Sequence, residues 1–289
     1  MLTTSEILQR VRRIEIKTKG LSNHIFAGEY HSAFKGRGMS FSEVREYTPG
    51  DDVKAIDWNV TARFSHPYVK VFEEERELTV MLLIDVSSSS LFGTHQRSKR
   101  ELITEMSAVL SFSAVTNNDK VGVLLFSDKI EKYIPPKKGK SHILRIIREL
   151  ITHEPSRSND TNVHVALEYL NNVVKKKTIA FVLSDFISRP YEKALQYAAR
   201  KHDVIGVQVF DKGDRELPKV GLVQTIDAEN GSINWIDTDE KNVRLQYQKI
   251  FDEQQQYFIQ SFRKCNAATL SVRTDEDYIK KLQGFFKAR

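Results

Sequence analysis

Three oxygen-bearing side chains stand at alternate positions just after an apolar run. The run at 80–84 reads Val-Met-Leu-Leu-Ile, and Asp85, Ser87 and Ser89 follow it in the spacing Asp-x-Ser-x-Ser. Hard divalent cations such as Mg²⁺ bind oxygen ligands, so this spacing could supply part of a metal site. On its own, the segment is more simply explained as a solvated serine-rich turn. The choice depends on what the rest of the chain brings to the same place.

The elements that would position these side chains begin at residue 79. Continuous apolar runs, typical of strands buried on both faces, alternate with amphipathic stretches typical of helices. This alternation predicts a doubly wound α/β domain with a mostly parallel sheet. The expected strands are 79–85, 120–126, 129–134, 178–184, 204–210 and 268–273, and the expected helices are about 98–115, 142–151, 162–174, 191–201, 241–264 and 277–288.

Two further loops could reach the same edge of this sheet. Ligands of doubly wound sheets bind beyond the carboxyl ends of the strands, where the winding direction reverses. If the fourth strand lies beside the first, Asp185 comes close to Asp85, and a third loop adds Thr161. Hydroxyl ligands are neutral and leave much of a metal's charge uncompensated, so such a site would attract an external carboxylate. The pattern therefore favours a metal-bridged docking site over a catalytic one.

Catalytic motifs are incomplete in this chain. A strand-end aspartate acting as a phosphoryl nucleophile usually has a second carboxylate two residues on, where this chain has Ser87. The Gly-Lys-Ser at 139–141 resembles the end of a P-loop, but Ile134 occupies the position of the required first glycine. A metal-dependent hydrolase or phosphatase that uses the same site is the alternative function.

Residues 1–78 differ from the alternating pattern. They begin with an amphipathic helix that carries Ile7, Val11 and Ile14 on one stripe, and they continue as a glycine- and charge-rich segment with short strands. No low-complexity linker follows, so we expect this part to pack on the main domain at 79–289. The main domain contains an inserted hairpin at 222–237, with its turn at 229–231.

Charged side chains and a tryptophan surround the turn Tyr-Thr-Pro-Gly-Asp-Asp at 47–52. The simpler interpretation is a clamp of paired charges that fixes residues 40–75 to the domain, and the alternative is a partner-binding surface. The residues concerned are Arg45, Asp51, Asp52, Asp57, Trp58 and Arg63.

Composition limits the location and the partners. Cys265 is the only cysteine of the 289 residues, which suits a reducing compartment. No apolar stretch approaches the roughly 18–20 residues of a membrane helix. We therefore expect a cytoplasmic protein, or one peripheral to the inner membrane. The net charge of +6 permits a nucleic-acid partner, but the basic clusters are short, scattered and not interleaved with aromatic residues, so we expect none.

The strand-end pattern resembles the von Willebrand factor type A domain and its metal-ion-dependent adhesion site. The motif of that site is Asp-x-Ser-x-Ser with a distant threonine and a distant aspartate, and the matching positions are Asp85, Ser87, Ser89, Thr161 and Asp185. This resemblance implies the strand order 3-2-1-4-5-6, with the strand at 129–134 antiparallel at the edge. It also implies bound Mg²⁺ or Mn²⁺, with an Asp or Glu of a partner completing the metal shell.

A second and more specific resemblance lies upstream. The stretch "GRGMSFSEVREYTPGDDVKAIDWNVTARF" at 36–64, with further pieces up to the C-terminal tail, is similar to the bacterial domain of unknown function 58 family. Members of that family are commonly encoded beside MoxR-type AAA+ ATPases and are thought to act with them in chaperone-like or assembly systems. The resemblance therefore implies a non-enzymatic adaptor or cofactor of such an ATPase.

Overall fold

The computed structural model describes residues 6, 9, 11–15, 40–64, 66–73, 78–94, 97–154, 160–226 and 233–289. The chain divides into two compact units, Phe34–Leu78 and the remainder. Ile7 and the hairpin turn at 229–231 lie outside the described residues. Within the described part of the chain, no helix has the length and apolar character needed to cross a bilayer.

The smaller unit is built on a two-stranded antiparallel sheet. Strands β1 (Ser40–Glu46) and β2 (Tyr68–Glu73) pair with each other, and the connection between them contains the short helix η1 (Val53–Ala55) and helix α3 (Trp58–Phe64). Neither of these helices contains a buried residue. Packing of this unit on the main domain stays a prediction.

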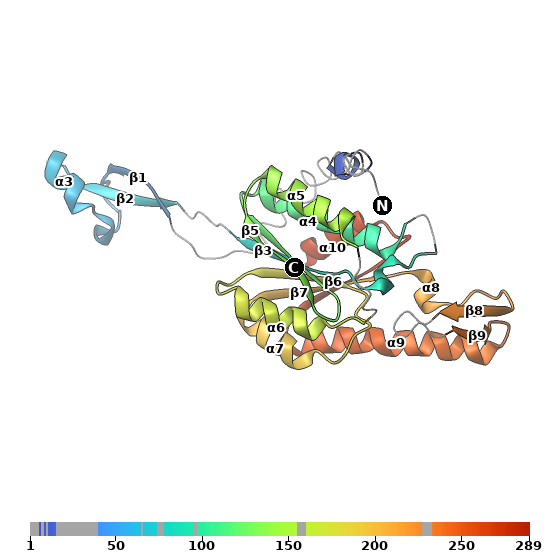
Figure 1. Ribbon diagram of the computed structural model, residues 1–289. Helices are drawn as coiled ribbons and strands as arrows, with labels where there is room; N and C mark the ends of the chain where they lie inside the picture. The colour runs from blue at the N-terminus through green and yellow to red at the C-terminus, as the bar shows by residue number, and fades with distance from the viewer. Residues whose placement is uncertain are drawn as a thin grey trace. The chain divides into compact units, whose positions relative to one another are not determined.

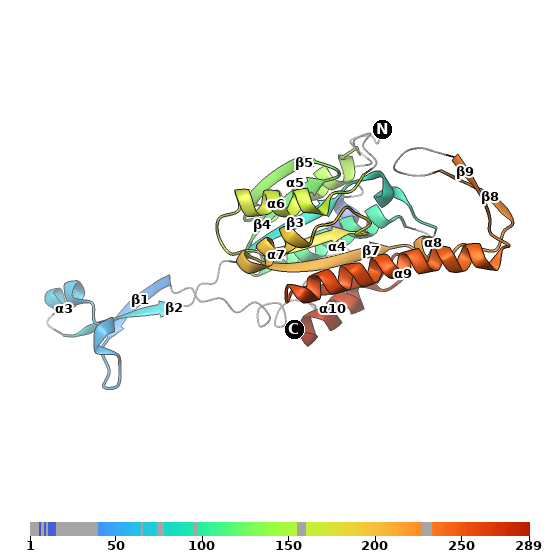
Figure 2. The ribbon, with the colours of Figure 1, turned by 90° about the horizontal axis from the view of Figure 1, so that it is seen from below.

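The larger unit contains a six-stranded sheet in the order β10-β7-β6-β3-β4-β5 (Figures 1 and 2). All neighbouring pairs are parallel except β4 and β5. Counted along this unit, the order is 3-2-1-4-5-6 with one antiparallel edge strand, which confirms the predicted von Willebrand factor A-like fold. The strands are β3 (Thr79–Asp85), β4 (Lys120–Phe126), β5 (Ile130–Lys137), β6 (Ile179–Ser184), β7 (Asp203–Phe210) and β10 (Ala268–Arg273).

The helices of the larger unit lie on both faces of this sheet (Figure 1). The sequence did not predict α8 and the short helix η2, and the other helices follow the predicted alternation. They are η2 (Ser88–Leu91), α4 (Lys99–Thr116), α5 (Lys140–Thr152), α6 (Val163–Val173), α7 (Glu192–Lys201), α8 (Lys212–Arg215), α9 (Lys241–Lys264) and α10 (Tyr278–Ala288). The edge strand β5 runs three residues beyond the predicted end at 134 and includes Pro135 and Pro136. Proline is tolerated there because an edge strand leaves some backbone groups without a ladder partner.

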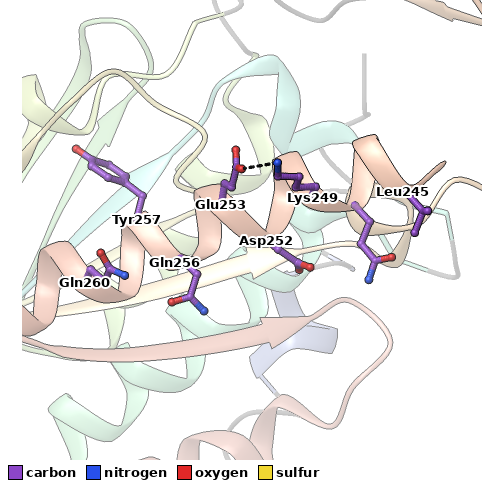
Figure 3. A pocket seen from close by; sticks show the side chains of 8 residues that line it. Leu245, Lys249, Asp252, Glu253, Gln256, Tyr257 and Gln260 are labelled. Atoms are coloured by element: carbon purple, nitrogen blue, oxygen red, sulfur yellow. Dashed lines mark ion pairs between the residues drawn. The ribbon is translucent and has the colours of Figure 1, made fainter. Parts of the chain in front are cut away.

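A two-stranded hairpin precedes α9 in the chain. Strands β8 (Leu222–Ile226) and β9 (Ile233–Asp237) pair antiparallel. On α9, a shallow hollow is lined by side chains of this helix alone, with one ion pair between Lys249 and Glu253 (Figure 3). None of the predicted metal-site residues lines this hollow.

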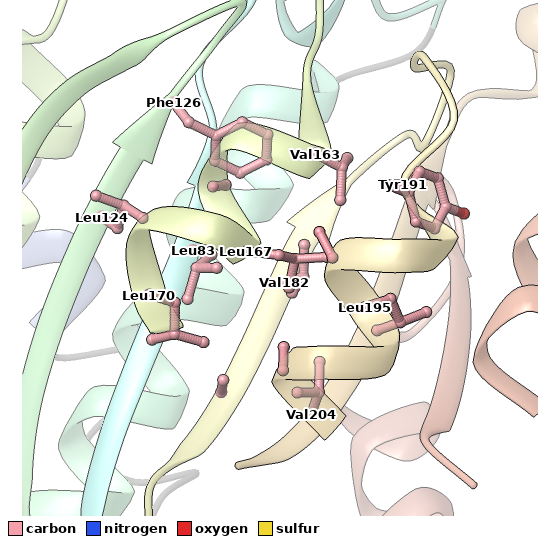
Figure 4. Packing of buried hydrophobic residues seen from close by; sticks show 14 of the residues in the cluster. Leu83, Leu124, Phe126, Val163, Leu167, Leu170, Val182, Tyr191, Leu195 and Val204 are labelled. Atoms are coloured by element: carbon pink, nitrogen blue, oxygen red, sulfur yellow. The ribbon is translucent and has the colours of Figure 1, made fainter. Parts of the chain in front are cut away.

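The core consists of apolar side chains on both sides of the sheet. On one side, residues of β3 and β6 such as Leu83 and Val182 pack against α6, α7 and α9 (Figure 4). On the other side, Val11 packs against α4 and α5, and Phe181 contacts Phe286 of α10. Each fully buried aliphatic side chain contributes roughly 1.5–3 kcal/mol. The larger unit has a large apolar core, and none of the predicted metal-site residues belongs to it.

Candidate functional site

The carboxylate of Asp85 is fixed at the carboxyl edge of the sheet. Strands β3 and β6 are parallel neighbours with Ile84 opposite Leu183, so Asp85 and Ser184 end their strands at the same level. The Ser184 hydroxyl donates to Asp85 Oδ2 at 2.6 Å, and the Ser87 backbone N–H donates to Oδ1 at 2.9 Å. These contacts fix the orientation of the Asp85 carboxylate at the end of β3.

The two serines of the motif are brought together by the helix η2. Ser87 is its N-cap residue, and its hydroxyl oxygen lies 3.0 Å from that of Ser89. Ser90 lies in the same turn, but its hydroxyl donates back to the Ser87 carbonyl at 2.6 Å. The turn therefore pairs the hydroxyls of Ser87 and Ser89 and directs that of Ser90 elsewhere.

Thr161 belongs to a loop at the same edge. The next residue, Asn162, donates its backbone N–H to the carbonyl of Ser127, just past the end of β4, at 2.8 Å. Val163 donates to the Ser188 hydroxyl at 3.1 Å, which ties this loop to the one that follows β6. Thr161 itself is buried. The loops after β3, β4 and β6 therefore converge at one edge, with Thr161 among them.

Asp185 is held by two donors, one of them a charged side chain. Its Oδ1 accepts from the backbone N–H of Ile187 at 3.2 Å, and its Oδ2 accepts from Lys99 Nζ at 3.0 Å. Lys99 is only 2% exposed and also pairs with Asp214 at 3.1 Å. Sequence reasoning missed both Lys99 and Asp214. The available signal was a lysine at the first position of a helix, where the helix dipole disfavours a cation.

Asp85 and Asp185 interact electrostatically at this edge. Burial, together with the negative charge of Asp185, raises the pKa of Asp85 to about 6, although hydrogen bonds from Ser184 and Ser87 oppose the shift. For Lys99, burial alone would lower the pKa. The carboxylates of Asp185 and Asp214 outweigh this effect and hold the pKa of Lys99 above its ordinary value. A divalent cation beside Asp85 would offset the repulsion between the two aspartates.

The side chains of the Asp-x-Ser-x-Ser motif and of Thr161 and Asp185 offer only oxygen atoms as possible ligands. Among the described residues, no three His, Cys, Asp or Glu side chains gather in a group suited to a metal ion. A metal at this edge would depend on the hydroxyls of Ser87, Ser89 and Thr161, with Asp85 and Asp185 supplying the negative charge. This oxygen set fits Mg²⁺ or Mn²⁺ better than the softer transition metals.

Two exposed apolar side chains lie next to the serines in the chain. Leu91 and Phe92 follow the serines directly, and they are 55% and 44% exposed.

The charged residues predicted around 45–63 lie within the smaller unit and divide into two groups. Asp51 accepts two hydrogen bonds from Arg45, at 2.7 and 2.8 Å, which with the Thr48 N–H hold the pKa of Asp51 well below its usual range. Asp52 caps η1, and Asp57 accepts from the first backbone N–H groups of α3. By contrast, Trp58 and Arg63 are exposed, Trp58 at 68%.

The sheet order and the motif at its edge define the class of protein, a von Willebrand factor A-like α/β domain. The model of the family described as "Protein of unknown function DUF58" matches residues 43–257, so this chain belongs to that family.

Similar proteins and solved structures were also found. An uncharacterized protein of Mycobacterium bovis is 29% identical over 281 residues, which cover 96% of this chain and 88% of the relative. The conserved hypothetical protein BatB from Bacteroides thetaiotaomicron is 17% identical, with a TM-score of 0.48 over 73% of this chain and 98% of that one. The SpRpn10 VWA domain is 11% identical, with a TM-score of 0.39 over 72% of this chain and 94% of that one.

Proposed function

We propose that this chain is a metal-ion-dependent protein–protein interaction module rather than an enzyme. The observation that carries the proposal is the 3.0 Å separation of the Ser87 and Ser89 hydroxyls beside the buried carboxylate of Asp85. Ser87, Ser89 and Thr161 would hold Mg²⁺ or Mn²⁺ directly, and Asp85 and Asp185 would act through hydrogen bonds and charge. When bound, the metal supplies an open coordination position for a carboxylate.

The partner would supply that carboxylate from an Asp or Glu. Three neutral hydroxyls compensate little of the metal's charge, and a unit charge pair at 4 Å is worth roughly 4 kcal/mol at an effective dielectric of 20. The exposed side chains of Leu91 and Phe92 give the partner an apolar surface next to the metal. The hydroxyl of Ser87 lies 3.0 Å from that of Ser89, an arrangement suited to two neighbouring metal ligands.

The partner we propose is a MoxR-type AAA+ ATPase, with this chain as its adaptor or cofactor in a chaperone-like or assembly system. Family resemblance alone supports this identity. The cytoplasm, or the periphery of the inner membrane, is the corresponding location.

The test compares two serines of the same turn. Ser87→Ala removes a proposed ligand, whereas Ser90→Ala removes a hydroxyl that contacts the Ser87 carbonyl. Both variants should lose a similar amount of stability, about 1 kcal/mol for one buried hydrogen bond. Only Ser87→Ala should lose Mg²⁺ and Mn²⁺ binding in calorimetry.

Binding to the proposed MoxR-type ATPase should then depend on bound metal. We expect a complex with wild-type protein and with Ser90→Ala in Mg²⁺, and a weaker one with Ser87→Ala or in EDTA. Equal affinity under all these conditions would contradict the proposal. Turnover of a phosphoester that disappears in Asp85→Ala would favour the hydrolase alternative instead.

A further inference from the structure

Lys99 occupies a position that a lysine ordinarily avoids. It is the first residue of α4, where the partial positive charge of the helix N-terminus repels a cation. It is also 2% exposed, whereas lysines are almost never fully buried unless they are paired. Its neighbours must therefore offset both the helix dipole and the loss of hydration.

Those neighbours are two carboxylates, Asp185 from the loop after β6 and Asp214 from α8. Lys99 Nζ lies 3.0 Å from Asp185 Oδ2 and 3.1 Å from Asp214 Oδ2. Asp214 is itself fixed, because its carboxylate caps α8 by accepting from the Asp211 backbone N–H at 2.7 Å. The ring of Phe92 lies on another side, with its centroid 5.7 Å from Nζ. The ammonium therefore has a fixed place between α8 and the loop after β6.

We propose that Lys99 is a positioning residue of the metal site, which acts through Asp185 by offsetting the charge of its carboxylate, so that a bound cation retains charge for a partner's carboxylate. This inference rests on the proposed function. With Lys99 present, the cation faces the carboxylate of Asp85 and the charge-compensated carboxylate of Asp185. Without Lys99, both carboxylates would act on the cation, and the free protein would bind metal more tightly.

The predicted sign separates this role from a merely structural one. Loss of a structural lysine disorders the site and weakens metal binding. Loss of a charge-compensating lysine strengthens it. Because Lys99→Met alone would leave two buried carboxylates unpaired, which is strongly destabilising, the substitution is combined with Asp214→Asn.

The experiment titrates Mn²⁺ alone into the full chain by calorimetry. The variants are Asp214→Asn, Lys99→Met with Asp214→Asn, and Lys99→Gln with Asp214→Asn. Glutamine keeps a hydrogen-bond donor toward Asp185, so this variant covers the case in which methionine disrupts the fold. Thermal melting in EDTA selects the folded variants. We expect both double variants to bind Mn²⁺ about tenfold more tightly than Asp214→Asn, an effect of roughly 1.4 kcal/mol.

The two proposals fail in different ways. If the wild-type protein does not bind Mn²⁺ even at millimolar concentration, the metal site itself is refuted. If the wild type binds Mn²⁺ and a folded double variant binds it no more tightly than Asp214→Asn, the role of Lys99 is refuted while the metal site stands.

Discussion

Replacing Asp85 by asparagine should stabilise the metal-free protein while abolishing metal binding. The asparagine side chain would keep an acceptor for the Ser87 N–H, which now donates to Asp85 Oδ1 at 2.9 Å. The substitution would also remove a charge that is buried and repelled by Asp185. The two effects have opposite signs for stability and function, as expected where a site is built for a ligand rather than for the fold.

The magnitude follows from the pKa of Asp85, which burial and Asp185 raise from 3.8 to about 6. The folded protein then holds this proton more strongly than the unfolded chain does, so stability falls as the pH rises from 3.8 to 6. Above pH 6 the full penalty applies. A difference of about two pKa units corresponds to on the order of 3 kcal/mol. Asp85→Asn should recover about 1–3 kcal/mol at pH 7.5 and little near pH 4.

The matched control is Asp211→Asn. Asp211 is also buried, but hydrogen bonds from Thr274, Thr94 and the Gly213 N–H outweigh the effect of burial and hold its pKa below the ordinary value. Its ionised form therefore stabilises the fold, and Asp211→Asn should cost about 1–3 kcal/mol. Urea denaturation in EDTA at pH 7.5 measures both variants. If Asp85→Asn loses as much stability as Asp211→Asn, the charge of Asp85 is not a strain on the metal-free fold.

Three further changes test other parts of the molecule. Burial lowers the pKa of His202 to about 4, so the stability that its neutral form contributes is present above about pH 6.5 and lost toward pH 4. His202→Leu should flatten that pH dependence of the urea midpoint. Gly206→Ala should cost about 1–3 kcal/mol, because its Cβ would lie 2.7 Å from the Phe258 ring, whereas Gly284→Ala, with open space around it, should not destabilise. Arg63→Ala should keep the melting temperature and lose partner binding if residues 40–75 form an interaction surface, and a lower melting temperature would indicate the clamp.

The larger unit was predictable because its elements are encoded locally. Runs of apolar residues such as 80–84 have the length and continuity of buried strands, and the alternation with helices requires a covered parallel sheet. A parallel sheet places every strand's carboxyl end at one edge. The positions of Asp85 and Asp185, at the ends of β3 and β6, follow from this rule.

The local sequence pattern could not predict features that depend on contacts between residues far apart in the chain. The lysine that pairs with Asp185 is 86 residues away in the chain, and its second partner, Asp214, is 115 residues from it. The exposure of Trp58 is another feature that local pattern does not predict. The sequence shows only that Trp58 has a large apolar side chain, not whether other residues bury it.

The sequence by itself therefore determined the sheet, its edge and the oxygen-bearing residues placed there, since apolar periodicity and strand direction act over a few neighbouring residues. Only the tertiary structure decided which charges offset one another at that edge. Coulomb interactions depend on separation in space, and the packing of α4 and α8 around the sheet brings Lys99 to within 3.0 Å of Asp185 and 3.1 Å of Asp214.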